Sequence, residues 1–110
     1  MNSQLSEKDY QIITELKKLL ISNNETLIEQ ILCYGSRVYA QKEDTDFDIL
    51  IITQRKISWQ EEMIILGDIY KFGLEKDIQF DAKFFSSEKL NYFYSQMPFI
   101  KNVLSYGIVV

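Results

Sequence analysis

The chain has 110 residues, no histidine, a single cysteine and, with 12 basic and 16 acidic side chains, a formal net charge of −4. Without histidine, it cannot form a Ser-His-Asp or Cys-His catalytic site or a His-ligated zinc or haem centre, and the lone Cys33 excludes an internal disulfide and an all-cysteine metal cage. The acidic balance argues against direct nucleic-acid binding, which needs a basic surface to neutralise phosphates.

The length and an apolar share of 46% predict one globular domain over residues 1–110. No apolar run approaches the roughly 20 residues of a membrane span, so we expect no membrane partner. The polar, acidic start MNSQLSEKDY is not typical of a signal peptide. Together with the unpaired cysteine, these features predict a cytoplasmic protein.

Apolar periodicity predicts helices and strands in alternation. Short apolar runs are typical of buried strands, whereas a segment that alternates polar and apolar residues predicts a strand with one polar face. In chain order we expect a helix over 6–21, a strand over 31–34, a short helix with Ser36 as its N-cap, a strand over 46–53, a helix over 58–73, an alternating strand over 77–84, helices over 86–94 and 98–105, and a turn followed by a short strand over 106–110. This order predicts an α/β (α+β) domain with a small mixed sheet of about four strands flanked by helices.

Capping signals set the expected helix boundaries. Ser6 is expected to cap the first helix, with Asp9 in its first turn. Ser58 and Glu61 form a Ser-x-x-Glu capping box for the longest later helix, and Gly73 is expected as its C-cap. The apolar residues of that helix form a helical stripe: Trp59, Met63, Ile64, Leu66, Ile69 and Tyr70.

The most informative local pattern is Asp46-Phe47-Asp48, at the start of the second strand. Residues two apart on a strand project to the same face, about 6.5 to 7 Å apart, so Asp46 and Asp48 share a face. The apolar run 49–52 predicts a strand buried on both sides, at whose mouth two carboxylates repel each other and lose solvation. Mg²⁺ relieves both costs, and it binds through one or two carboxylates together with substrate phosphates.

Two further features can complete a site with this pair. Asp81 lies on the polar face of the alternating strand and, if the two strands are neighbours, makes a three-carboxylate cluster; three acids can hold two metal ions roughly 3.5 to 4 Å apart. Gly35 and Ser36 follow a strand and open a helix, where backbone N–H groups and the helix dipole favour an anion such as phosphate.

Each of these features also has a purely structural alternative. Gly35 and Ser36 can form a capped turn, and Asp81 can be a solvated edge residue. Arg37 can lie on the surface or pair with an aspartate, and Cys33 is expected to pack in the core. The joint order of an anion turn, an Asp-x-Asp strand and a third aspartate on another strand favours a common site.

That order is similar to the DNA polymerase β-type nucleotidyltransferase superfamily, and within it to the minimal nucleotidyltransferases, the MNT or MntA-like proteins. The resemblance spans about residues 7 to 110 and rests on three segments: Tyr34-Gly35-Ser36-Arg37-Val38-Tyr39-Ala40, Thr45-Asp46-Phe47-Asp48-Ile49-Leu50-Ile51 and Ile78-Gln79-Phe80-Asp81. Two positions depart from the pattern, since Ala40 stands where glycine is common and Thr45 where serine is frequent.

The resemblance implies a polymerase β-like fold and transfer of a nucleoside monophosphate, most often AMP from ATP, to an acceptor hydroxyl. It assigns catalysis and the binding of two Mg²⁺ ions to three carboxylates: Asp46, Asp48 and Asp81. It assigns the phosphates of the nucleoside triphosphate to the turn residues: Gly35, Ser36 and Arg37.

The resemblance also implies a protein partner. Minimal relatives are commonly antitoxins of HEPN-type toxins and modify a tyrosine of the toxin, and an acidic surface suits a basic partner. Three alternatives stay open. The chain can be a non-catalytic antitoxin or interaction module, a small-molecule nucleotidyltransferase acting as a homodimer or other homo-oligomer, or a structural domain with coincidental acids.

Overall fold

The structure is a computed structural model that describes residues 5–24, 27–39, 46–93 and 97–110. Its elements in chain order are α1 (Glu7–Asn23), β1 (Ile28–Tyr34), α2 (Ser36–Tyr39), β2 (Phe47–Thr53), α3 (Trp59–Lys76), β3 (Phe80–Ser86), α4 (Ser87–Phe93), α5 (Pro98–Tyr106) and β4 (Ile108–Val109). Among the described residues, no helix combines the length and the apolar character that a membrane crossing requires.

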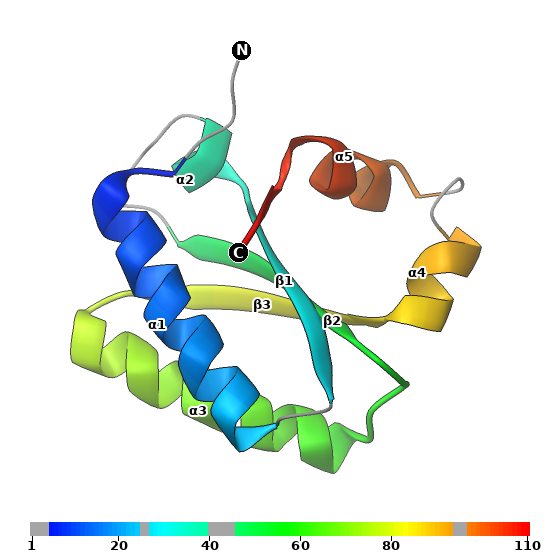
Figure 1. Cartoon of the computed structure of the whole chain (residues 1–110), viewed down its shortest axis with the longest axis horizontal. Coiled ribbons are helices and arrows are strands. Elements are labelled where there is room, and N and C mark those ends of the chain that lie inside the picture. Colours follow the sequence, from blue (N-terminus) through cyan, green and yellow to red (C-terminus); the bar gives the residue numbers. More distant parts are fainter. Residues whose placement is uncertain (1–4, 25–26, 40–45, 94–96) are drawn as a thin grey trace.

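The strands form one four-stranded mixed sheet in the order β3-β2-β1-β4. β1 pairs antiparallel with both β2 and β4, whereas β2 and β3 run parallel. Helices α1 and α3 cover one side of this sheet, and α4 and α5 lie on the other (Figure 1). This α+β arrangement confirms the expected class of a small mixed sheet flanked by helices.

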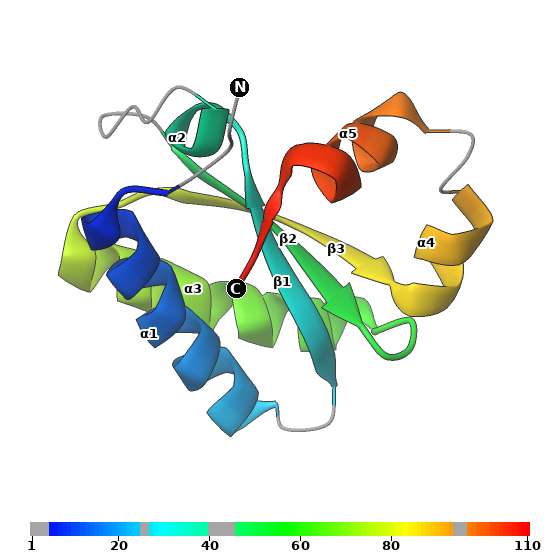
Figure 2. The same ribbon diagram turned by 45° about the horizontal axis from the view of Figure 1, so that its top comes forward.

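The core has two parts because β1 and β2 are buried on both faces. Phe47, Ile49 and Ile51 of β2 point toward α1 and α3, where they join the larger buried cluster. Leu50 and Ile52 point to the other side and pack with Val103 of α5. The continuous apolar run of β2 therefore predicts its central place in the sheet correctly. Figure 2 shows α2 and α5 near the same end of the sheet, where β1 ends.

The expected N-terminal caps are present. The Ser6 hydroxyl accepts a hydrogen bond from the Asp9 backbone N–H at 3.1 Å. Ser58 and Glu61 form the complete capping box at the start of α3. These local hydrogen bonds satisfy backbone donors that a helix start leaves unpaired, and so their pattern is readable without tertiary information.

The expected end of α3 at Gly73 is wrong. The helix continues to Lys76, and Asp77 ends it in the left-handed conformation with φ of 57°. Gly73 is needed for a different reason, because a Cβ there would lie 2.4 Å from the carbonyl oxygen of Ile78. The chain folds back onto the helix at this point, and the Ile78 N–H donates to the Gly73 carbonyl at 2.9 Å.

Three other boundaries differ from expectation. β1 begins at Ile28 instead of 31, and β3 begins at Phe80 instead of 77, because β3 pairs with β2 only from the Phe47 position onward. Ser36 is the first helical residue of α2, so Gly35 and not Ser36 occupies the capping position. The last strand, β4, follows the turn at Gly107 as expected, and Tyr94, the expected end of α4, lies outside the described residues.

Candidate functional site

The sheet register brings two of the three predicted carboxylates side by side. Asp48 pairs with Asp81 across the parallel β2–β3 ladder and with Tyr34 across the antiparallel β1–β2 ladder. Directly opposite residues project to the same face, here the face that α5 covers. The condition that the two aspartate-bearing strands are neighbours is therefore met.

The Gly35 turn lies directly against this carboxylate pair. Gly35 has φ of 84°, and a Cβ built on it would lie 2.1 Å from Oδ2 of Asp48. Its carbonyl oxygen accepts hydrogen bonds from the N–H groups of Val38 and Tyr39, both at 3.0 Å. Both the backbone conformation and the closeness of Asp48 require glycine at this position. The two patterns that the sequence places ten or more residues apart thus form one structural unit.

The three predicted acids act on one another electrostatically. Partial burial is the largest cause that raises the pKa of Asp48, and the negative charges of Asp81 and Asp46 raise it further. Lys83 opposes this shift, and its ammonium lies 3.4 Å from Oδ2 of Asp81. Asp46 lies just before β2 and, like Asp81, is exposed. Asp48 is therefore an anion whose charge is only partly compensated by its neighbours.

These oxygen donors fit a magnesium site in which the protein supplies only one or two of the ligands. As the side chains lie, the described part of the chain contains no group of three or more acidic or cysteine side chains placed to hold a metal ion. Burial and the neighbouring acids raise the pKa of Asp48, and Lys83 offsets this only in part. Mg²⁺ commonly binds through one or two carboxylates and completes its shell with phosphate oxygens and water. Asp48 and Asp81 meet that requirement, and the third ligand and the second ion stay predictions.

The predicted phosphate role of the Arg37 side chain is not supported. Its guanidinium is buried and donates from Nη1 to Oδ1 of Asp9 at 2.9 Å, with side-chain exposures of 6% and 2%. It also lies over the Phe47 ring, 5.1 Å from the centroid. Phe47 faces α1, so the guanidinium lies on the opposite side of the sheet from Asp48. Of the two structural alternatives, pairing with an aspartate is the correct one.

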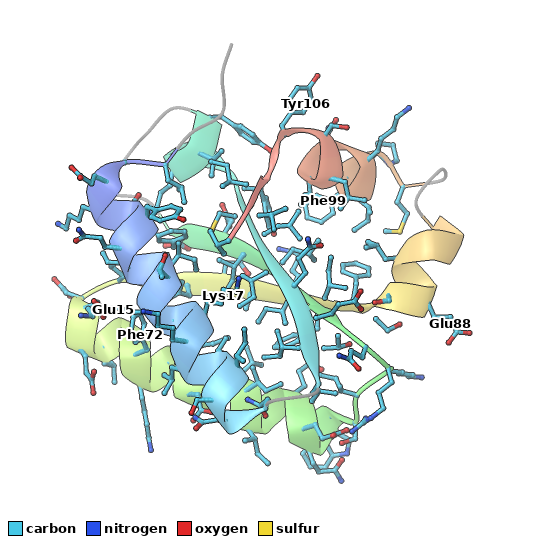
Figure 3. The ribbon with its side chains drawn as sticks, viewed as in Figure 1. Glu15, Lys17, Phe72, Glu88, Phe99 and Tyr106 are labelled. Atoms are coloured by element: carbon cyan, nitrogen blue, oxygen red, sulfur yellow. The ribbon has the colours of Figure 1, made fainter. Side chains whose placement is uncertain are left out.

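Three further residues lie near the acids: Tyr34 and Phe99, which the sequence patterns did not single out, and Lys83, which they place on the same strand face as Asp81. The Tyr34 hydroxyl is buried without a hydrogen-bond partner among the described residues, and its ring meets Phe99 edge-on, with centroids 5.4 Å apart. The ammonium nitrogen of Lys83 lies 5.8 Å from the centroid of the Phe99 ring. Figure 3 shows Phe99 pointing from α5 toward the sheet, whereas Tyr106 of the same helix points away.

The signals for these three residues differ. Lys83 lies two residues after Asp81 on the same strand face, so strand periodicity was enough to find it. Burial raises the pKa of Tyr34, whereas Lys83 acts to lower it. Phe99 carries no local signal, because only the packing of α5 on β1 brings it to this place.

Two positions of the resemblance, Ala40 and Thr45, lie outside the described residues. Comparisons with known protein families, with curated proteins and with solved structures found no match to this chain. The family resemblance therefore rests on the residue pattern, and the function is inferred from the geometry around Asp48.

Proposed function

We propose that this protein is a Mg²⁺-dependent nucleotidyltransferase that transfers a nucleoside monophosphate to a hydroxyl of a partner protein. The first donor to test is ATP, from which the transferred group would be AMP. The observation that carries the proposal is the contact between the Gly35 turn and Asp48, with Asp81 in register beside it. A backbone turn suited to phosphate next to carboxylates suited to Mg²⁺ is the arrangement that a metal–triphosphate substrate needs.

The backbone around Gly35 is assigned to the phosphates. Helix α2 has only four residues, so its dipole is small and binding relies on N–H groups of the turn. Asp48, supported by Asp46 and Asp81, would hold Mg²⁺ against the same phosphates. When bound, the metal neutralises phosphate charge and lowers the pKa of the acceptor hydroxyl. The net charge of −4 makes binding of a bare triphosphate unfavourable.

We assign the acceptor proton to Asp81, the role that the resemblance implies for this residue. Its side chain is 52% exposed, so an acceptor from another molecule can reach it. The acceptor oxygen forms a bond to the α-phosphorus while the bond from that phosphorus to the bridging oxygen of the β-phosphate breaks. Pyrophosphate leaves with that electron pair, and the acceptor proton passes to the Asp81 carboxylate. Histidine is not required for this chemistry.

The resemblance favours a HEPN-type toxin as the acceptor protein and an antitoxin role in the cytoplasm. The test incubates the chain with labelled ATP, Mg²⁺ and the product of the neighbouring reading frame. We expect label on that protein, lost in Asp48→Asn and Asp81→Asn. Asp68→Asn is the matched control, because Asp68 lies on α3 and bonds Asn23. Transfer that survives both active-site substitutions would contradict the assignment.

Binding of nucleotide gives a second readout that does not depend on the acceptor. Calorimetry should detect ATP binding with Mg²⁺ and none with excess chelator, and Asp48→Asn should abolish the heat. A stable complex with the neighbour, without label transfer and without nucleotide binding, would favour the non-catalytic antitoxin instead. Label transfer to a small molecule alone would favour the small-molecule transferase.

A further inference from the structure

The outer face of α3 exposes an unusual amount of apolar surface. Its inner face packs into the core through Ile65, Ile69 and Phe72. Five large apolar side chains point outward instead, with exposed fractions of 58% to 70%: Trp59, Met63, Ile64, Tyr70 and Leu74. Large apolar side chains that gather on an exposed surface often mark a site of interaction with another molecule.

Gly67 lies at the centre of this outer face. It is exposed, and a Cβ built on it would meet nothing within 4 Å. Glycine in a helix interior costs about 1 kcal/mol relative to alanine, and no described neighbour occupies the space that it leaves. Beside it runs an open groove of about 870 Å³ that continues past Tyr70 and Leu74 to Ile78 and Phe80. The face therefore has a low centre, a hollow toward its C-terminal end and a projecting Trp59 near its N-terminal end.

We propose that this face is the interface of a homodimer in which the α3 helices of two copies pack antiparallel, with the two-fold axis at Gly67. Trp59 lies eight residues before Gly67 and Leu74 seven residues after it, about 12 and 10.5 Å along the helix. An antiparallel pair thus seats Trp59 of each copy beside Leu74 of the other, in the hollow. Met63 of one copy faces Tyr70 of the other by the same symmetry.

Charges on the same face favour the antiparallel orientation. Lys71 and Glu75 border the apolar side chains on the C-terminal half of α3. A parallel pair would place each of them against its own copy, which is unfavourable. An antiparallel pair places Lys71 beside Ile64 and Glu75 beside Gln60, so neither of these charges meets its own copy.

The exposed area suits a second copy. Five side chains of this size, each more than half exposed, present an apolar patch on the order of several hundred Å². A stable interface buries about 800 Å² from each partner, so the dimer has to cover the 18-residue helix together with the groove beside it. The face lies on the α1–α3 side of the sheet, away from Asp48, so the homodimer does not depend on the proposed transferase activity.

Sedimentation equilibrium of the intact chain tests the proposal. The wild type should be a dimer, and Gly67→Arg and Tyr70→Glu should be monomers with unchanged circular dichroism. Gly67→Arg is expected to fold, because the site is open and arginine is a good helix former. Tyr10→Glu is the control, since it removes a 54% exposed tyrosine from α1 and should leave the dimer intact.

A monomeric wild type would overturn the proposal and would leave the face to a different protein. An equally dimeric Gly67→Arg variant would overturn it too, because it would place the interface elsewhere. Gly67→Arg should retain wild-type label transfer, so failure of the homodimer and failure of the transferase are distinguishable.

Oxidative cross-linking tests the orientation. Gly67→Cys lies at the proposed axis, and two copies should form a disulfide there if their α-carbons come within about 7 Å. Trp59→Cys should not cross-link to itself in an antiparallel pair, whose two copies of this position are about 24 Å apart along the helix. Cys33 is buried and does not interfere. Efficient self-cross-linking of Trp59→Cys, without that of Gly67→Cys, would refute the antiparallel arrangement.

Discussion

The buried pair of Asp9 and Arg37 offers the sharpest test of how this fold is held together. The Nη1–Oδ1 distance is 2.9 Å and both side chains are almost fully buried. At an effective dielectric constant of about 20, the gross attraction at this distance is about 6 kcal/mol, most of which desolvation cancels. The pair as a whole therefore stabilises the fold little, but either partner alone is a buried, uncompensated charge.

Arg37→Met should accordingly lower the free energy of unfolding by about 3–5 kcal/mol. Loss of the guanidinium over Phe47 adds to this cost, by about 1–2 kcal/mol at a desolvated site. The expected fall in Tm is on the order of 15 to 30 °C, measured by calorimetry or circular dichroism. Adding Asp9→Leu should raise the stability again, because apolar side chains then replace both charges.

Arg55→Met is the matched control, since Arg55 makes an exposed ion pair with Glu61 at 2.7 Å. It should change the Tm little, because surface ion pairs contribute little to stability. The reasoning fails if Arg37→Met is no more destabilising than Arg55→Met, or if the double variant is less stable than Arg37→Met alone. At a temperature where Arg37→Met is folded, it should still bind ATP with Mg²⁺, because the guanidinium lies on the far side of the sheet from Asp48.

Further predictions concern two glycines, one acid and the cysteine. Gly67→Ala should raise the unfolding free energy by up to about 1 kcal/mol in dilute protein. Gly73→Ala in the same helix should lower it, because its Cβ would lie 2.4 Å from the Ile78 carbonyl oxygen. Equal effects of the two substitutions in denaturant titrations would contradict the geometry. Burial and neighbouring acids raise the pKa of Asp48 in the folded state, so its ionisation opposes folding. Asp48→Asn should therefore raise the Tm at neutral pH without Mg²⁺. This gain should vanish as the pH falls through the raised pKa, because the wild-type carboxyl then takes up its proton. A gain in Tm that persists in acid would point to another cause. Burial raises the pKa of Cys33 to about 12, so alkylation of its thiol should occur only as fast as the protein unfolds, and rapid labelling of the native protein would refute the buried placement.

The local patterns of the chain were sufficient for much of the fold and part of the site. Helix starts at Ser6 and Ser58 were readable because caps involve residues three apart. The central strand was readable because a strand buried on both faces must be apolar throughout. The strand patterns placed Asp48 and Asp81 on polar strand positions and brought them together only on the condition that the two strands are neighbours, which the register shows.

Other features depend on contacts between distant segments, which local patterns do not encode. Arg37 pairs with Asp9, 28 residues earlier, only because α1 packs over the turn after β1. Gly73 is needed because the chain folds back there toward β3. Its position near the end of the helix suggested a C-cap, but the cap is Asp77. Phe99 reaches Tyr34 only through the docking of α5.

The long helix α3 separates the two kinds of information most clearly. Its residues by themselves determine a helix with a capping box at its start and with apolar side chains on more than one side. They do not determine which side faces the sheet, since apolar residues occupy both sides. Tertiary packing decides this: Ile65, Ile69 and Phe72 enter the core, whereas Trp59 and Tyr70 stay outside. The physical reason is that burial is a property of the surroundings of a side chain, and only the assembled sheet and helices supply those surroundings.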